Sequence, residues 1–261
     1  MGNDKEDLLL TFKSLGGSVI DYAAPIFSPS LKQTHVKKLQ TMQNHCLCVI
    51  TGSHLAASTE HLHHETMTLP VDDHLQLISR QFLATALQRS HPSFEVVSAQ
   101  PGPRPLRHTL TSRHSQAVAP FLRGGAIPDG GRADALKDLH TSAVAVAVNN
   151  MDSNPNRVIL ARPPAIHSSE AKLPRHWRSA LSQLRSGFCR CLNSYRAVLD
   201  PTTSTLCPDC NADNHSVRHL FECATFPTTL LEVDLWSNPL HVARFLSLLP
   251  SFSHLPPVPP F

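Results

Sequence analysis

The segment CPDCNADNHSVRHLFEC, residues 207–223, carries Cys207, Cys210, His219 and Cys223 in the spacing C-x2-C-x8-H-x3-C. Two cysteines separated by two residues can hold one ion from a tight turn. A histidine and a cysteine four residues apart project from the same face of a helix, toward a common point. The pattern therefore predicts a structural zinc site with four protein ligands and no vacant position for a substrate. His215, one helical turn before His219, is an alternative nitrogen ligand or a supporting side chain.

A C-x-x-C pair is also typical of redox dithiols, but no βαβ pattern surrounds this one. The other cysteines form two C-x-C pairs, Cys46 with Cys48 and Cys189 with Cys191. On a helix, the two members of such a pair point to divergent faces, so we expect one member to be buried rather than to bind metal. The odd count of seven cysteines, without a signal peptide, argues against a secreted disulfide scaffold and favours a reducing compartment.

The composition indicates an intracellular chain, nuclear or cytoplasmic, of one large or two smaller domains. Its 23 Lys and Arg against 20 Asp and Glu leave a net charge of +3, which permits nucleic-acid binding without indicating it. No apolar run approaches the length of a membrane span, and the acidic start, MGNDKEDLLL, is unlike a targeting signal. We therefore expect no membrane partner.

Hydrophobic periodicity predicts a mainly α fold. Residues 1–91 are expected to form one helical module, and residues 92–165 an irregular connector rich in Pro and Gly. Residues 166–250 are expected to form a second helical module around the zinc site, followed by a Pro-rich tail, 251–261, that is extended or disordered. Within the connector, the run SAVAVAVN at 142–149 fits either a buried strand or a helix of small residues.

The longest helices are expected over 30–50, 71–89 and 173–195, because apolar residues recur there every three or four positions. We expect these apolar stripes to be buried. Their members are Leu31, His35, Leu39, Met42, Cys46 and Val49 in the first, Leu75, Ile78, Phe82, Leu83 and Leu87 in the second, and Trp177, Leu181, Leu184, Phe188 and Leu192 in the third.

Two stretches together resemble the C-terminal part of jockey-like non-LTR (LINE-type) retrotransposon reverse transcriptases. LLLTFKSLGGSVIDYAAPIFSPSLKQTHVKKLQTMQNHCLCVITG, residues 8–52, is similar to the thumb that follows the polymerase palm. LPRHWRSALSQLRSGFCRCLNSYRAVLDPTTSTLCPDC, then HLFEC and DLWSNPLHVARFL, is similar to the end of the same polyproteins, where a zinc knuckle follows an LSQLRSG helix. The likeness covers about two thirds of the chain, in the family's order.

This resemblance implies a thumb that clamps the template–primer duplex and a zinc module that contacts the element's RNA or the target DNA. It does not supply the polymerase active site, because two-metal nucleotidyl transfer needs clustered carboxylates. The one Asp-Asp pair, Asp72-Asp73, precedes an amphipathic helix and fits the favourable N-terminal end of a helix dipole. We therefore expect a fragment of an RNA-directed DNA polymerase that lacks catalytic residues and does not polymerise alone.

Basic residues on the predicted helices are candidates for phosphate contacts that tolerate any sequence and weaken with salt. In the thumb-like module these are Lys32, Lys37 and Lys38. Before the zinc site they are Arg178, Arg185 and Arg190. Trp177, Tyr195 and Phe221 could stack on unpaired bases, although core packing is the favoured role for Trp177 and Phe221.

Two other functions compete with this interpretation. The chain could be a zinc-stabilised protein-interaction relic, with the Pro-rich tail available to a protein partner. It could also be a zinc hydrolase or deaminase, since His63-x-Glu65 with Cys207 and Cys210 faintly resembles the deaminase signature. The deaminase order fails because Pro208 follows the first cysteine instead of preceding it. We expect the histidines of residues 61–64 to be solvated surface residues.

Overall fold

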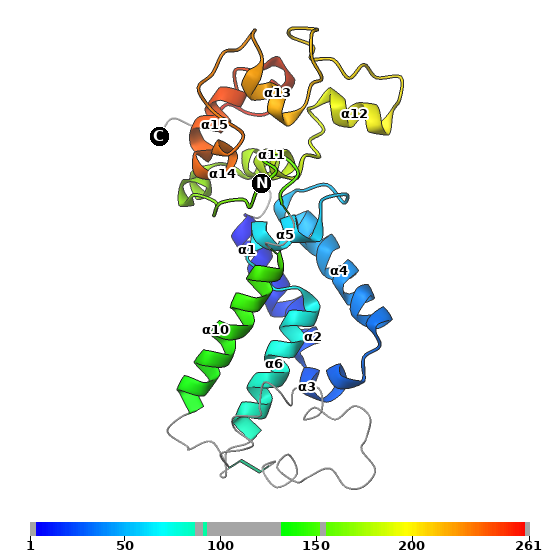
Figure 1. Ribbon diagram of the computed structural model, residues 1–261, viewed down its shortest axis with the longest axis vertical. Helices are drawn as coiled ribbons and strands as arrows, with labels where there is room; N and C mark the ends of the chain where they lie inside the picture. The colour runs from blue at the N-terminus through cyan, green and yellow to red at the C-terminus, as the bar shows by residue number, and fades with distance from the viewer. Residues whose placement is uncertain (1–3, 87–90, 93–131, 152–154, 259–261) are drawn as a thin grey trace. The chain divides into compact units, whose positions relative to one another are not determined.

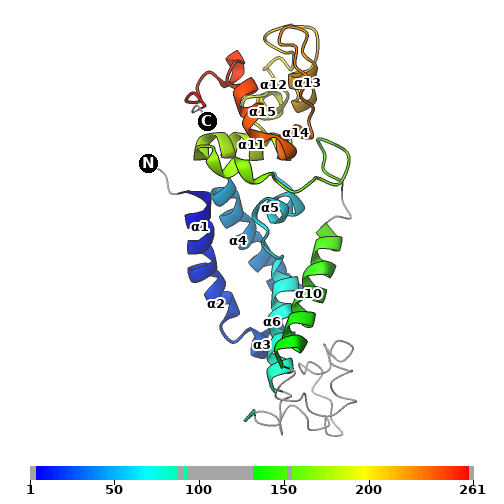
Figure 2. The ribbon, with the colours of Figure 1, turned by 90° about the vertical axis from the view of Figure 1, so that its left-hand side faces the viewer.

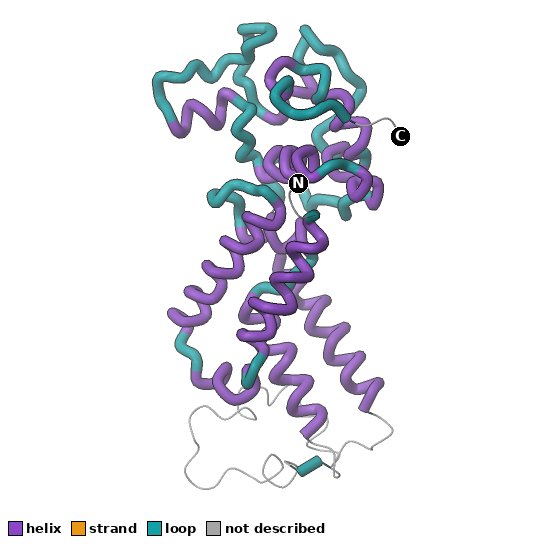
Figure 3. Tube along the Cα trace, turned by 180° about the vertical axis from the view of Figure 1, so that it is seen from behind, coloured by secondary structure: helices purple, strands orange, loops and turns teal. Residues whose placement is uncertain are grey.

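The computed structural model describes residues 4–86, 91–92, 132–151 and 155–258. Figure 3 shows that these residues form helices and loops, with no strand among them. The predicted mainly α fold is therefore confirmed. The residues around 142–149, which periodicity left open between strand and helix, belong to a helix, α10 (Arg132–Met151).

The chain forms two compact units, and each combines segments that are distant in sequence. One unit comprises Met1–Leu10, Asn44–Thr68 and Met151–Phe261, and we call it the metal unit. The other comprises Thr11–Gln43 and Leu69–Asn150, and we call it the helical unit. These limits do not coincide with the linear borders expected near residues 91 and 165. Most of the expected connector, residues 93–131, lies outside the described residues.

The helical unit contains α10 and a set of helices from two earlier segments. These are a π-helical turn (Phe12–Gly17), α2 (Ser18–Asp21), α3 (Ala24–Phe27), a 3-10 turn (Ser28–Ser30), the first part of α4 (Gln33–Thr51) and α6 (Val71–Ala86). α1 (Lys5–Thr11) leads into it from the metal unit. In Figure 2, α3 lies beside α6, and their contact buries Ala24, Val71 and Leu75.

The buried face of α4 is not the one that the sequence predicted. Val36, Leu47 and Ile50 are buried, whereas Met42 and Val49 of the expected stripe are 64% and 67% exposed. The helix carries apolar residues on two faces, and both faces fit a helical period. Periodicity alone could not show which face has a partner.

The C-terminal end of α4 follows the sequence prediction. Gly52 adopts φ +73°, the left-handed conformation that ends helices and that favours glycine. A Cβ atom at this position would lie 2.2 Å from Oγ of Ser179, within the same unit. The turn therefore needs glycine both for its backbone conformation and for its packing.

The metal unit has its core between α11 (Arg175–Ser186), α14 (Asp234–Ser237) and α15 (Pro239–Leu246), which lie together in Figure 1. The same unit also contains α5 (Thr59–Thr66), α12 (Asn193–Leu199) and α13 (Val217–Glu222), together with most of α1 and the end of α4. The apolar stripe of α11 is buried as expected, with Trp177, Leu181 and Leu184 each 0% exposed. The predicted helix over 173–195 is interrupted, because Gly187 ends α11 with φ +73° and a loop precedes α12.

The Pro-rich tail begins as packed structure rather than as an extended segment. Residues Pro250–Phe252 form a 3-10 turn, and Phe252 is 1% exposed with its ring stacked near that of Trp177. The indole N–H of Trp177 donates to the carbonyl of Pro256 at 2.8 Å. The expectation of an extended or disordered tail is therefore wrong for residues 251–255, which form turns; residues 259–261 lie outside the described residues.

Candidate metal centre

The first two cysteines of the cluster lie in a tight loop that folds back on itself. An antiparallel pair between Leu206 and Asn214 closes the loop, and the Cys207 amide donates to the carbonyl of Asp213 at 2.8 Å. Inside it, the amide of Asn211 donates to the carbonyl of Cys207 at 2.9 Å, and Asn211 adopts φ +53°. The turn therefore directs both thiols of C-x-x-C to the same side.

The other two candidate ligands lie on α13 and at its end. The hydroxyl of Ser216 caps this helix by accepting from the His219 amide at 3.3 Å. His219 lies inside the helix and Cys223 immediately follows its last residue, Glu222. The predicted one-turn spacing therefore brings an imidazole and a thiol to the C-x-x-C loop.

The four side chains converge on one point. Their ligand atoms all lie within 4.8 Å of one another, so the cluster could hold a metal ion such as zinc. Sγ of Cys207 lies 4.0 Å from Sγ of Cys223, and Sγ of Cys210 lies 3.3 Å from Nε2 of His219. In a tetrahedron with zinc–sulfur bonds of about 2.3 Å, two sulfurs stand about 3.8 Å apart. The donor set and its dimensions both fit zinc.

The imidazole of His219 presents Nε2 to the thiols and Nδ1 to Asp213. Nδ1 lies 3.9 Å from a carboxylate oxygen of that residue. A carboxylate on the far side of a ligating histidine favours the tautomer with its lone pair on the metal side. His215 is directed elsewhere, because its Nδ1 accepts from the amide of Asn193 at 3.2 Å. His219 is therefore the candidate nitrogen ligand of the cluster, and His215 supports the loop before α12.

The thiols differ in how readily they ionise. Backbone N–H groups of Ala212 and Asp213 lower the pKa of Cys210 to about 7. Burial raises the pKa of Cys207. Metal ions bind the thiolate form, so Cys210 offers a ligand already partly ionised at neutral pH.

Two of the expected phosphate-binding arginines are instead buried in ion pairs. Arg185 is 0% exposed, and its guanidinium binds Glu65 at 2.8 Å, Glu170, and the carbonyl of Leu235 at 2.9 Å. This placement removes Arg185 from the side chains that can reach a phosphate. Burial alone would raise the pKa of Glu65, but Arg185 and Lys5 lower it to about 2. The ion pair is therefore charged in both members at neutral pH.

Arg178 is also buried, at 5% exposure. Its guanidinium binds Asp4 at 2.6 Å and Glu6 at 2.9 Å, so it attaches the start of the chain to α11 within the metal unit. The expectation of a phosphate contact is wrong for this residue too. Its carboxylate partners lie more than 170 positions away in sequence, so the sequence around Arg178 could not predict these ion pairs.

The other predicted nucleic-acid contacts remain open to solvent. Lys32 precedes α4, Lys37 and Lys38 lie in its first turns, and all three are exposed, as is Arg190. Trp177, Tyr195 and Phe221 are buried, so core packing is their role in this fold. Asp72 and Asp73 lie in the first turn of α6, as the helix-dipole argument predicted.

Two of the three histidines of α5 are buried, not solvated as the sequence suggested, and the third, His64, is partly exposed. His61 and His63 are 8% and 0% exposed, and Glu65 is 5% exposed. Burial lowers the pKa of His61 to about 4, so it is neutral at pH 7. Its Nε2 lies 3.4 Å from the hydroxyls of both Ser53 and Ser182. The density of His and Glu in residues 61–65 is a sign of this buried polar cluster, although two of its partners, Ser182 and Arg185, lie about 120 positions away in sequence.

Neither His63 nor Glu65 belongs to the Cys3His cluster, which already offers four ligands.

Of the C-x-C pairs, the first follows the prediction, with Cys48 buried and Cys46 exposed. Both members of the second pair, Cys189 and Cys191, are buried, because this segment is a loop and not a helix.

Comparison with known protein families, with curated proteins and with solved structures finds no match to this chain. None of the described helices combines the length and the apolar character that crossing a bilayer requires.

Proposed function

We propose that this protein is the C-terminal, nucleic-acid-contacting portion of a non-LTR RNA-directed DNA polymerase, without the polymerase palm. The observation that carries the proposal is the Cys3His cluster, which converges after an LSQLRSG helix in the order that the resemblance implies. In this account, zinc fixes the loop of residues 207–214 against α13 and has no catalytic role, because four protein ligands leave it no open position.

The thumb-like part supports the proposal through its charge. Lys32, Lys37 and Lys38 are exposed at the start of a long helix, where they can contact phosphate groups. Such contacts displace counterions and give binding that does not depend on base sequence. Arg190 adds an exposed cation in the metal unit, whereas Arg178 and Arg185 contribute to folding only.

Two assays on the purified zinc-loaded chain test this function. Fluorescence anisotropy should show binding of RNA and DNA oligonucleotides that weakens steeply as salt rises. Primer extension on a templated duplex should show no incorporation of nucleotides. Templated synthesis would overturn the proposal. Binding no better than that of a neutral protein at moderate salt would instead favour a protein-interaction role for the zinc-stabilised fold.

A further inference from the structure

A tight loop in the metal unit holds an arginine, Arg157, that forms no ion pair with any carboxylate in the described part of the chain. The backbone N–H of Asn156 donates to the carbonyl of Ala161 at 2.9 Å, and the backbone N–H of Leu160 donates to the carbonyl of Asn156 at 2.8 Å. The Asn156 side chain accepts from Val158 and donates to the carbonyl of Arg185 at the end of α11. The loop is thereby attached to the helix end, and it fixes the position of Arg157.

The side chain of Arg157 lies along Gly187 and over the ring of Phe188. The guanidinium carbon is 4.3 Å from the ring centroid. A Cβ atom at Gly187 would approach the Arg157 side chain to 3.1 Å, so any other residue there would require this side chain to shift by a few tenths of an ångström. Arg157 is exposed, and among the residues that the structure describes it has no hydrogen bond and no carboxylate partner. One face of the guanidinium is therefore covered by the ring, and its charge is not neutralised.

The ring beneath the guanidinium is itself held in place. Phe188 packs edge-on against Tyr195, with ring centroids 5.8 Å apart, and lies 6.2 Å from the ring of His54. The Tyr195 hydroxyl lies 2.5 Å from Nε2 of His54, whose Nδ1 accepts from the amide of Ala56. Since Nδ1 accepts, Nε2 carries the proton and donates to the hydroxyl. Arg157 thus rests on a rigid aromatic support.

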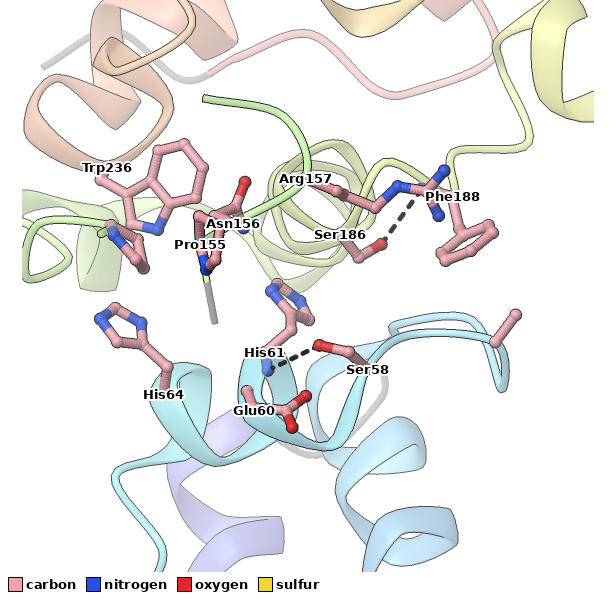
Figure 4. Close-up of a pocket in the computed structure, with 12 residues that line it drawn as sticks. Ser58, Glu60, His61, His64, Pro155, Asn156, Arg157, Ser186, Phe188 and Trp236 are labelled. Atoms are coloured by element: carbon pink, nitrogen blue, oxygen red, sulfur yellow. Dashed lines mark hydrogen bonds between the residues drawn. The ribbon is translucent and has the colours of Figure 1, made fainter. Parts of the chain in front are cut away.

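Arg157 and Phe188 line two depressions of the metal unit. The first has a volume of about 260 Å³, and Figure 4 shows His61, His64 and Trp236 around it. The second has a volume of about 410 Å³ and includes Tyr195, Val198 and Arg218. The second volume lies within the range of about 300–1,000 Å³ that is typical of small-molecule sites, and the first lies just below it. The stacked pair therefore borders both depressions.

We propose that Arg157, supported by Phe188, is a contact site for single-stranded nucleic acid. A base stacks on the free face of the guanidinium, and the N–H groups of the guanidinium bind the adjoining phosphate. Neighbouring nucleotides occupy the two depressions. Unpaired bases fit this site better than a duplex, whose bases are already stacked on each other. An acidic peptide would use the charge but not the planar face. The inference rests on the proposed function and names the form of nucleic acid that the metal unit binds.

Anisotropy with the full zinc-loaded chain tests the site with three labelled probes: a 12-nucleotide oligo(dT), a duplex of the same length, and a 12-residue oligoglutamate. Arg157→Gln should weaken oligo(dT) binding by about tenfold, in the range measured for the loss of one base stack. Arg157→Lys should weaken it nearly as much, because an ammonium keeps the charge but cannot stack. Lys172→Gln removes an exposed charge from the same unit outside both depressions, and it should leave binding within twofold of the original.

Each outcome of this comparison bears on one claim. Full binding by Arg157→Lys, equal losses for oligo(dT) and duplex, or equally tight binding of oligoglutamate would overturn the stacking site. If the unaltered chain binds oligo(dT) and Arg157→Gln changes nothing, the inference fails while the proposed function stands. If the unaltered chain binds no oligonucleotide, both fail. Unchanged zinc content and far-ultraviolet circular dichroism of each variant exclude a folding defect as the cause.

Discussion

At Cys210, the amides of Ala212 and Asp213 stabilise a thiolate before any metal arrives. If Cys210 binds the metal, replacing it leaves three donor side chains and an open coordination position. We expect Cys210→Ser to lower the zinc content from one ion per chain to near zero, and to lower the midpoint of thermal unfolding. Elemental analysis after dialysis measures the number of zinc ions per chain. Cys46→Ser is the matched control, because Cys46 is exposed and outside the cluster. Retention of a full ion by Cys210→Ser would show that this thiol is not a ligand.

The buried guanidinium of Arg185 gives a second prediction for a single residue. Removing it leaves two buried carboxylates, Glu65 and Glu170, without their partner. We expect Arg185→Gln to lower the free energy of unfolding by about 3–5 kcal/mol, as for other broken buried ion pairs. Arg190→Gln, at an exposed position, should change it by less than about 0.5 kcal/mol. Equal values for both variants in urea denaturation would contradict the burial of Arg185.

Protonation of His61 gives a third prediction. Its pKa falls from 6.5 to about 4 on folding, so between these values the unfolded chain binds more protons than the folded chain. Stability is therefore greatest above pH 6.5 and falls as the pH drops toward 4. Glu65, with its pKa lowered from 4.5 to about 2, extends the loss to lower pH. His61→Gln should reduce the slope of the free energy of unfolding against pH between pH 6.5 and 4. His35→Gln, at an exposed position, should not change this slope. Parallel slopes for His61→Gln and the original chain would contradict this assignment.

At the scale of a helix, the end of α4 depends on one glycine. An alanine at Gly52 would have to adopt φ +73° and would bring its Cβ against Ser179. We expect Gly52→Ala to destabilise the protein by more than about 1 kcal/mol, from the left-handed backbone alone. Gly17→Ala is the control, because its backbone is helical and the nearest atom to its Cβ would be 3.8 Å away. That substitution should be neutral or stabilising. An unchanged midpoint of thermal unfolding for Gly52→Ala would contradict the left-handed conformation of residue 52.

The elements also show what the sequence could and could not predict. The Cys3His cluster was predictable because its residues lie in one short segment, where the spacing of a turn and a helix fixes their geometry. The helical class and the end of α4 were predictable for the same local reason. The buried face of α4 was not, since both faces are apolar and the choice depends on distant partners. The burial of Arg185 was not predictable either, because its partner Glu65 is 120 positions away in sequence. A buried arginine and an exposed one can have the same local sequence pattern.

For the whole molecule, the proposed function predicts a definite dependence on salt. Each phosphate contact with a single strand contributes about −0.7 to the slope of log affinity against log salt concentration. Replacing Lys32, Lys37 and Lys38 together by Gln should therefore make the slope shallower by about 2. The effect should be similar for any base sequence, because lysines that bind phosphate read no bases. Anisotropy titrations at several salt concentrations give the slope, and an unchanged slope would remove these lysines from the interface.

The account depends above all on one ion held by Cys207, Cys210, His219 and Cys223. X-ray absorption at the zinc edge of the purified chain tests it most directly. We predict three sulfur ligands at about 2.3 Å and one nitrogen at about 2.0 Å, with no exchangeable water. A shell with oxygen ligands or fewer than three sulfurs, or a chain that folds without binding zinc, would contradict the central claim.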